Sequence, residues 1–189
     1  FFACFAIAIA AALGVAFSRN LFTLFVFYEV LSLSTYPLVT HHQDEEGMKA
    51  GRTYLGILMG TSIGLFLLGM IWLYALTGTL EFTPGGILPE GVTTRTTMLL
   101  LALFAFGTGK AALMPFHKWL PAAMVAPTPV SALLHAVAVV KTGVFSTLRV
   151  FLFIFGADTM RTIGADNLTL GFAAVTIIVA SLLALGQDN

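Results

Sequence analysis

The sequence predicts an all-α protein, a polytopic transmembrane helical bundle. Hydrophobic residues make up 58% of the 189 residues, and charged residues make up only 10%. Soluble domains are about 45–50% apolar and about 25% charged, so this chain has too little polar surface for a water-soluble fold of its size. The mean hydropathy of +0.96 agrees. The composition argues against a soluble enzyme, a nucleic-acid binder, a disordered protein and a disulfide scaffold.

Apolar runs give the expected number of helices. A helix that crosses the hydrocarbon core needs about 20 mostly apolar residues. Runs of this kind predict about six spans, at 1–17, 21–40, 53–76, 97–120, 127–155 and 168–186. Polar segments, or segments rich in glycine and proline, separate most of them, at 18–20, 41–51, 78–95 and 156–167. No segment predicts an inserted soluble domain.

The fourth span contains the clearest irregularity. Gly107 and Gly109 are followed by Pro115, and a proline inside a helix removes a backbone hydrogen bond and clashes with the preceding turn. In lipid such a break is tolerated where protein or a water-filled cavity satisfies the freed groups. We expect one helix broken near Pro115; the alternative is a simple kink or the end of the helix. The fifth span opens with Pro127 and Pro129, which suit a helix start.

Three charged residues lie inside the predicted spans. Glu29 is in the second, Lys110 in the fourth and Lys141 in the fifth, where His135 accompanies it. An ionisable group at the bilayer centre costs about 2.5–3.5 kcal/mol on the insertion scale. We therefore expect all of them to face the interior, with the Glu29 carboxylate close to a lysine ammonium.

Two explanations fit these charges. A static buried ion pair would fix helix packing, but the second lysine leaves it with a cation that has no anion. Low dielectric favours the neutral form of a lysine and a nearby carboxylate favours the charged form, so a lysine between these effects can load and unload a proton. His135 is either a proton carrier or a hydrogen-bonded packing residue. It lies about 9 Å along the helix axis from Lys141, so a relay between them needs water or a helix distortion.

Other signals are few. The Lys and Arg residues equal the Asp and Glu residues in number, so no charged tail points to a nucleic acid. Cys4 is the single cysteine and cannot form an internal disulfide. No GxGxxG, P-loop, HExxH or CxxC pattern occurs, so we expect no cofactor and no metal site. The chain starts without methionine or a basic signal region, which suggests a fragment of a longer protein.

Several segments resemble the antiporter-like membrane subunits. These are the proton-pumping subunits of respiratory complex I and the A and D subunits of Mrp-type sodium/proton antiporters, with relatives in membrane-bound hydrogenases. The similarity covers essentially the whole chain and is carried by residues 28–29, 33–37, 109–121, 126–136 and 140–145.

The resemblance implies a domain organisation. Members of this family carry about fourteen helices, including two inverted five-helix repeats that each contain a broken helix. Residues 1–155 would be the first repeat, with five transmembrane helices. Residues 156–189 would be the connecting loop and the truncated first helix of the second repeat. The segment alone would then be an incomplete pump.

The resemblance also implies roles for the buried charges. Glu29 matches the glutamate that pairs with the lysine matched by Lys110, while His135 and Lys141 match positions that continue a central polar axis. The implied function is a proton-translocating membrane subunit of an NADH:quinone oxidoreductase (complex I)-like assembly, a translocase in which this chain performs no redox chemistry. Three alternatives remain: a component of an Mrp-type sodium/proton antiporter, a structural membrane subunit with static ion pairs, and a solute carrier.

The same family implies the surroundings of the chain. We expect other membrane subunits of a multisubunit respiratory or antiporter complex and the lipid bilayer as its partners. The transported ion would be the proton, or sodium as well in the antiporter alternative. The location would be a bacterial inner membrane, crossed several times.

Overall fold

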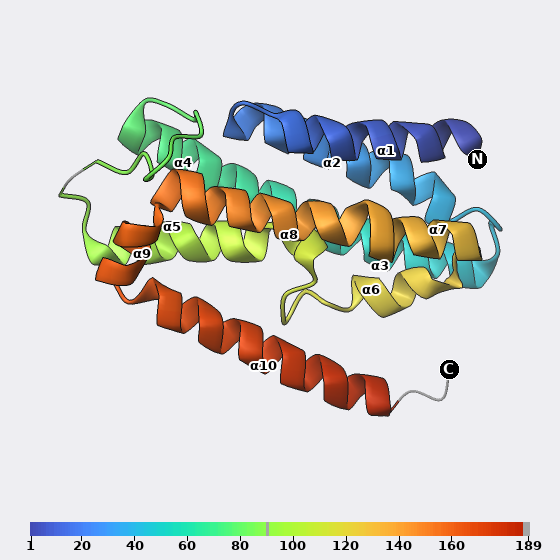
Figure 1. The fold of residues 1–189 in the computed structure, drawn as a ribbon. Coiled ribbons are helices and arrows are strands. Elements are labelled where there is room, and N and C mark those ends of the chain that lie inside the picture. Colours follow the sequence, from blue (N-terminus) through green and yellow to red (C-terminus); the bar gives the residue numbers. More distant parts are fainter. Residues whose placement is uncertain (90, 187–189) are drawn as a thin grey trace.

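The structure is a computed structural model that describes residues 1–89 and 91–186, and it confirms the predicted fold class. The described chain is mostly helical, and its extended parts form only an isolated bridge between Asn20 and Glu81. Most of the long helices lie roughly side by side (Figure 1).

The long helices have the dimensions of membrane spans. Four helical segments are long and apolar enough to cross a membrane, at Leu21–Val39, Glu45–Thr77, Thr128–Phe155 and Ala165–Leu185. Two shorter apolar helices, at Phe2–Phe17 and Thr94–Gly107, accompany them. The chain is thus built as a multi-pass integral membrane protein.

The first two helices form a hairpin that follows the predicted spans. α1 (Phe2–Phe17) and α2 (Leu21–Val39) are joined by three residues and pack against each other (Figure 1). Asn20 starts α2, because its side-chain oxygen accepts a hydrogen bond from the Thr23 amide over 2.8 Å. The buried face of α1 carries mainly alanine, which lets the two backbones approach closely.

The third segment starts earlier than the sequence predicted. It consists of α3 (Glu45–Thr61), the π-helical turn η1 (Ser62–Leu67) and α4 (Leu68–Thr77). Asp44 caps its first turn by accepting a hydrogen bond from the Gly47 amide over 2.7 Å. The prediction of a connection through residue 51 is therefore wrong from Glu45 onward, because the charged residues there continue the helix. Gly78, at φ 68°, ends α4.

The fourth segment is interrupted, and the interruption begins before Pro115. α5 (Thr94–Gly107) is followed by the short turn η2 (Gly109–Ala111), irregular backbone at 112–118, α6 (Trp119–Ala122) and η3 (Ala123–Val125). Gly107 packs directly on the third segment, where a Cβ atom would lie 2.6 Å from the Phe66 amide nitrogen. Pro115 therefore lies within the break rather than at its start.

The fifth segment is long but not uniform. α7 (Thr128–Ala132), η4 (Leu133–Val137), α8 (Val139–Val150) and η5 (Phe151–Phe155) follow one another in one rod. η4 and η5 are π-helical turns, and Ala138 between η4 and α8 has φ −112° and ψ −68°. The helical hydrogen-bond pattern thus changes next to His135.

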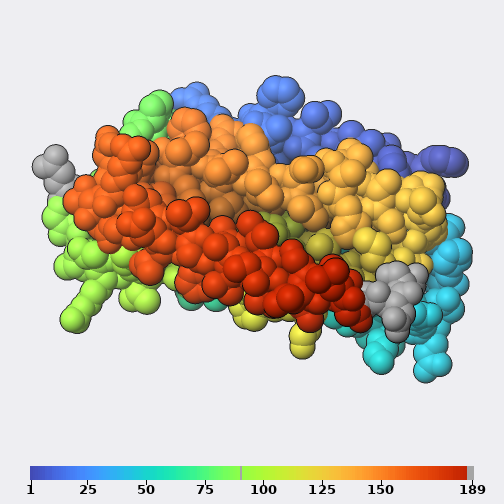
Figure 2. Space-filling model, turned by 60° about the horizontal axis from the view of Figure 1, so that its bottom comes forward, coloured from blue at the N-terminus to red at the C-terminus, as the bar shows by residue number. Residues whose placement is uncertain are grey.

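The sixth segment lies apart from the rest. After the short α9 (Ala157–Thr162), α10 (Ala165–Leu185) runs along the outside of the other helices (Figures 1 and 2). Its membrane-length window has no buried residue. One of its contacts is the edge-to-face pair of Phe172 with Phe106 of α5, with ring centroids 5.6 Å apart.

Two hydrophobic clusters form the core. One contains Tyr54 and Trp119, and the other contains Tyr28, Phe66 and Phe104. The turn η2 makes hydrogen bonds to a member of each cluster, Trp119 and Tyr28. Burial on two sides fixes this short turn, although it has few backbone hydrogen bonds of its own.

Candidate functional site

Lys110 lies on η2 and is completely buried. Its Nζ donates a hydrogen bond to Ser32 Oγ over 2.7 Å. The same nitrogen lies 3.2 Å from the centroid of the Tyr28 ring. An ammonium over an aromatic face is attracted by the ring quadrupole, and more strongly where water is excluded. The lysine amine is thus held by a hydroxyl and a ring, both from α2.

The backbone around Lys110 is held by further contacts. The Lys110 amide donates to the Tyr28 hydroxyl over 3.1 Å, and Trp119 Nε1 donates to the Gly109 carbonyl over 2.9 Å. α8 approaches from another side at Gly143, where a Cβ atom would lie 2.5 Å from the Lys110 carbonyl carbon. These contacts fix the backbone of the break at Lys110.

Glu29 lies on the same face of α2 as Ser32, three residues away. Both carboxylate oxygens are buried and accept no hydrogen bond from a described residue. No Glu29 oxygen lies within 4.0 Å of Lys110 Nζ. In the described part of the chain the only ion pair is the exposed one between Arg19 and Glu81, at 3.4 Å. The structure thus brings Lys110 to the helix face that bears Glu29, with Ser32 as the direct partner of its amine.

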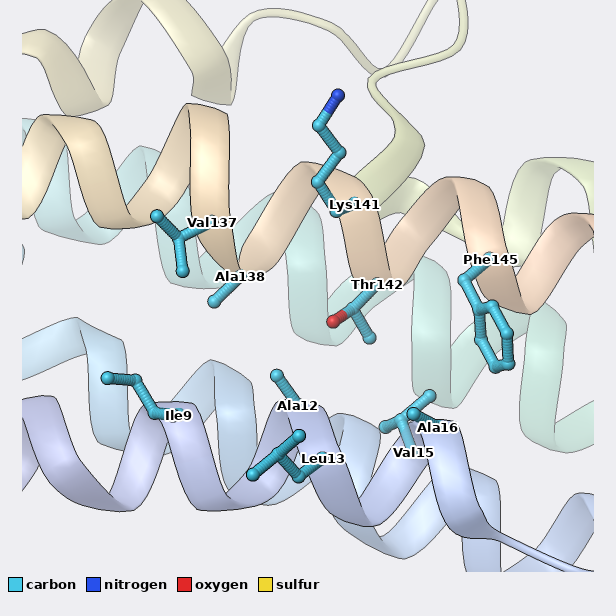
Figure 3. A pocket seen from close by; sticks show the side chains of 10 residues that line it. All are labelled: Ile9, Ala12, Leu13, Val15, Ala16, Val137, Ala138, Lys141, Thr142 and Phe145. Atoms are coloured by element: carbon cyan, nitrogen blue, oxygen red, sulfur yellow. The ribbon is translucent and has the colours of Figure 1, made fainter.

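His135 and Lys141 are not brought into contact with Lys110. His135 lies in the π-helical turn η4, half-buried, and its Nε2 atom is buried without a partner among the described residues. Lys141 is exposed on α8 beside a groove of about 260 Å³ between α8 and α1. Figure 3 shows its side chain pointing away from α1. The groove lining is otherwise mainly apolar.

Several buried polar atoms in this region lack a protein partner. Among the described residues they include both Glu29 oxygens, His135 Nε2 and Ser146 Oγ. Ser146 lies one turn after Gly143 on α8, the helix that packs on η2. Buried polar atoms in folded proteins nearly always have a partner. These are therefore the polar atoms of the region that no described residue satisfies.

Sequence reasoning selected the charged residues but not the groups that hold them. Tyr28, Ser32 and Trp119 make the direct contacts with η2 or its lysine. The available signal was the spacing of Tyr28 and Ser32, which places them one turn apart around Glu29. Within the described residues, no three His, Cys, Asp or Glu side chains gather as a metal site. The site offers an amine, a carboxylate and hydroxyls, a set suited to exchanging protons.

Comparison with known proteins identifies the family of the chain. The family model of the NADH:quinone oxidoreductase/Mrp antiporter transmembrane region matches residues 18–189. NAD(P)H-quinone oxidoreductase chain 5 of Picosynechococcus sp. is 34% identical over 94% of this chain and 28% of its own length. A Na(+)/H(+) antiporter subunit of Alkalihalophilus pseudofirmus is 36% identical over 95% of this chain and 22% of its own length. The chain thus spans less than a third of these relatives.

Solved structures show the same fold. A chain of the membrane-bound sulfane sulfur reductase, an archaeal respiratory membrane complex, superposes with a TM-score of 0.83 and 30% identity, over 98% of this chain and 38% of that one. A chain of the Mrp complex from Dietzia sp. gives a TM-score of 0.74 and 27% identity, over 86% of this chain and 18% of that one. The matches include both redox-linked and antiporter assemblies.

Proposed function

Because the chain belongs to the NADH:quinone oxidoreductase/Mrp antiporter transmembrane family, we propose that it is part of a proton-translocating membrane subunit. The observation that carries the proposal is Lys110, a completely buried amine on the broken helix that faces the α2 surface bearing Glu29. Such a group is expensive in the membrane interior and is typical of ion pathways. Its chemistry is reversible protonation, with no redox step in this chain.

The proposed path runs from Glu29 and Lys110 toward His135 and Lys141. The proposal is supported by buried polar atoms without partners on Glu29, His135 and Ser146. These residues belong to α2, η4 and α8, the helical segments along which the proposed path runs. The π-helical turn η4 contains His135 and ends at its C-cap Ala138, three residues before Lys141, so the helix is irregular along the stretch where an ordinary helix would keep the two side chains apart. The exposed Lys141 would be the point where the path leaves this segment.

The partners follow from the related assemblies. We propose that the full-length protein works among other membrane subunits of a respiratory or antiporter complex, in a bacterial inner membrane. Residues 1–155 would be the first antiporter-like repeat, and 156–189 the start of a second. The position of α10 outside the other helices supports this division. Energy for transport would come from partner subunits of that complex.

The test uses the full-length protein in its native membrane vesicles, with proton uptake followed by a pH-sensitive dye. Lys110→Ala, Glu29→Gln and Lys141→Ala should each slow translocation, Lys110→Ala by about a hundredfold, because a positioned proton-transfer group contributes on that order. Lys49→Ala, which removes an exposed lysine of α3, is the matched control and should leave the rate unchanged. Near wild-type translocation by all three variants would refute the proposal.

Sodium/proton exchange is the second candidate, and it is favoured by the 36% identity to the Na(+)/H(+) antiporter component of Alkalihalophilus pseudofirmus. The same lysine could serve both kinds of assembly. Vesicles loaded with sodium and diluted into sodium-free buffer distinguish them, because an exchanger takes up protons without a respiratory substrate. A redox-driven pump would take up protons only when its electron donor is added.

A further inference from the structure

The amine of Lys110 is bound by two side chains of α2, Ser32 and Tyr28, and not by Glu29. Its Nζ contacts Ser32 Oγ at 2.7 Å and the Tyr28 ring at 3.2 Å, and both partners are completely buried. The Ser32 hydroxyl donates to the Tyr28 carbonyl over 3.3 Å, which directs its lone pairs toward an incoming donor. A hydroxyl acceptor and an aromatic face are both good partners for an ammonium group.

The Tyr28 ring has partners other than the Lys110 amine. It stacks on Phe66 with ring centroids 5.9 Å apart and an angle of 10° between the planes. Its hydroxyl accepts a hydrogen bond from the Lys110 amide over 3.1 Å. The ring therefore contacts η1 through Phe66 and η2 through its hydroxyl, and the Lys110 amine lies over the ring as well.

The Glu29 carboxylate offers a second place for the same amine. Glu29 adjoins Tyr28 in sequence and lies one turn from Ser32 on α2. Its oxygens are buried, and no described residue donates a hydrogen bond to them. A lysine side chain has four flexible methylene groups, so a rotation of the side chain alone moves the ammonium between neighbouring partners on one helix face.

We propose that Tyr28 and Ser32 form a holding site for the Lys110 amine that competes with the Glu29 carboxylate. This inference rests on the proposed function. Lys110 then alternates between an ion pair with Glu29 and the holding site, and only in the holding site is it free of the carboxylate that keeps its proton. Tyr28 and Ser32 are positioning residues, because they act through the place of Lys110.

The test is a double-substitution cycle on proton translocation by the full-length protein in its native membrane vesicles. Tyr28→Leu removes the ring, so Lys110 remains with Glu29 and the rate falls about tenfold, the scale of a desolvated cation–π contact. Tyr28→Phe keeps the ring but removes the acceptor of the Lys110 amide, so its rate should fall less than that of Tyr28→Leu. In a Glu29→Gln background there is no competing carboxylate, so adding Tyr28→Leu should change the remaining rate less than about twofold.

A merely structural role for Tyr28 predicts a different result. Loss of packing would lower the rate by the same factor in the wild-type and the Glu29→Gln backgrounds, and that outcome would overturn the holding site. Phe104→Leu, which removes a buried ring from the same cluster, is the matched control and should lower the rate by the same factor in both backgrounds.

If Lys110→Ala stops translocation while Tyr28→Leu does not slow it, the holding site fails and the proposed function stands. If Lys110→Ala itself translocates normally, the proposed function fails.

Discussion

Trp119 is the side chain that ties the second half of the broken helix to the turn carrying Lys110. It is completely buried, and its Nε1 donates to the Gly109 carbonyl over 2.9 Å. Trp119→Phe keeps an aromatic ring but removes this hydrogen bond, and the Gly109 carbonyl keeps only its bond from the Ala112 amide at 3.0 Å. The loss of one such bond costs about 0.5–1.5 kcal/mol. We expect a lower melting temperature of the purified full-length protein and slower proton translocation, because η2 is held less firmly.

Trp72→Phe is the control for this substitution. Trp72 is a partly buried residue of α4 whose indole makes no hydrogen bond with a described residue. It loses comparable ring volume without losing a donor. Equal melting temperatures for the two variants would show that the hydrogen bond to Gly109 does not stabilise the turn.

For single residues, the sequence predicted which charged side chains matter but not which side chains contact them. Glu29 and Lys110 are identifiable because a charged residue in an apolar run is rare and costly. Tyr28, Ser32 and Trp119 are ordinary residues of a membrane helix, and their part depends on which helices meet. The opposite environments of Lys110, which is buried, and Lys141, which is exposed, also depend on packing between segments distant in sequence.

Among the elements, α8 and η2 make one of the closest backbone approaches in the molecule. A Cβ atom on Gly143 would lie 2.5 Å from the Lys110 carbonyl carbon and closer still to the Ala111 amide. Gly143→Ala must therefore push α8 away from η2, and overpacking of this kind costs about 1–3 kcal/mol. We expect a lower melting temperature and reduced translocation by the full-length protein.

Gly171→Ala gives the matched comparison for a helix glycine. Gly171 lies in α10, and a Cβ atom there would meet nothing within 4 Å. Alanine is favoured over glycine in a helix by about 1 kcal/mol, so this variant should be as stable as the wild type or more so. If Gly143→Ala behaved in the same way, the close approach would not be a constraint on the site.

The helix boundaries separate what local sequence determines from what packing determines. The start of α2 could be predicted because a polar segment with a capping residue precedes it. The end of α5 was expected near Pro115 but falls at Gly107, where contact with the Phe66 backbone leaves no room for a side chain. The π-helical turns η1, η4 and η5 carry no proline, and nothing in their local sequence indicated them.

In the molecule as a whole, α10 exposes a large apolar surface that no other described helix covers. Leu170, Ile177 and Leu182 are each more than half exposed, and the buried core lies almost entirely in the preceding helices. In a bilayer this apolar surface is stable against lipid. The exposure of α10 is what the proposal that it opens a further repeat predicts.

Whether the charges serve transport or architecture is decided at the scale of the whole assembled protein. Glu29→Gln combined with Lys110→Met removes two charges from the membrane interior, where each costs about 2.5–3.5 kcal/mol. Replacing two opposite buried charges together by neutral groups is often harmless to stability. We therefore expect the double variant to assemble in native membranes at the wild-type level or above, while translocation is lost because no ionisable group remains on η2. Quantitative immunoblots and dye-based proton uptake measure the two effects.

Arg19→Gln with Glu81→Gln is the control, because it removes the exposed pair. It should change neither assembly nor translocation, since exposed pairs contribute about 0–1 kcal/mol. A double variant that assembled and still translocated protons would mean that the buried charges only lock helices together.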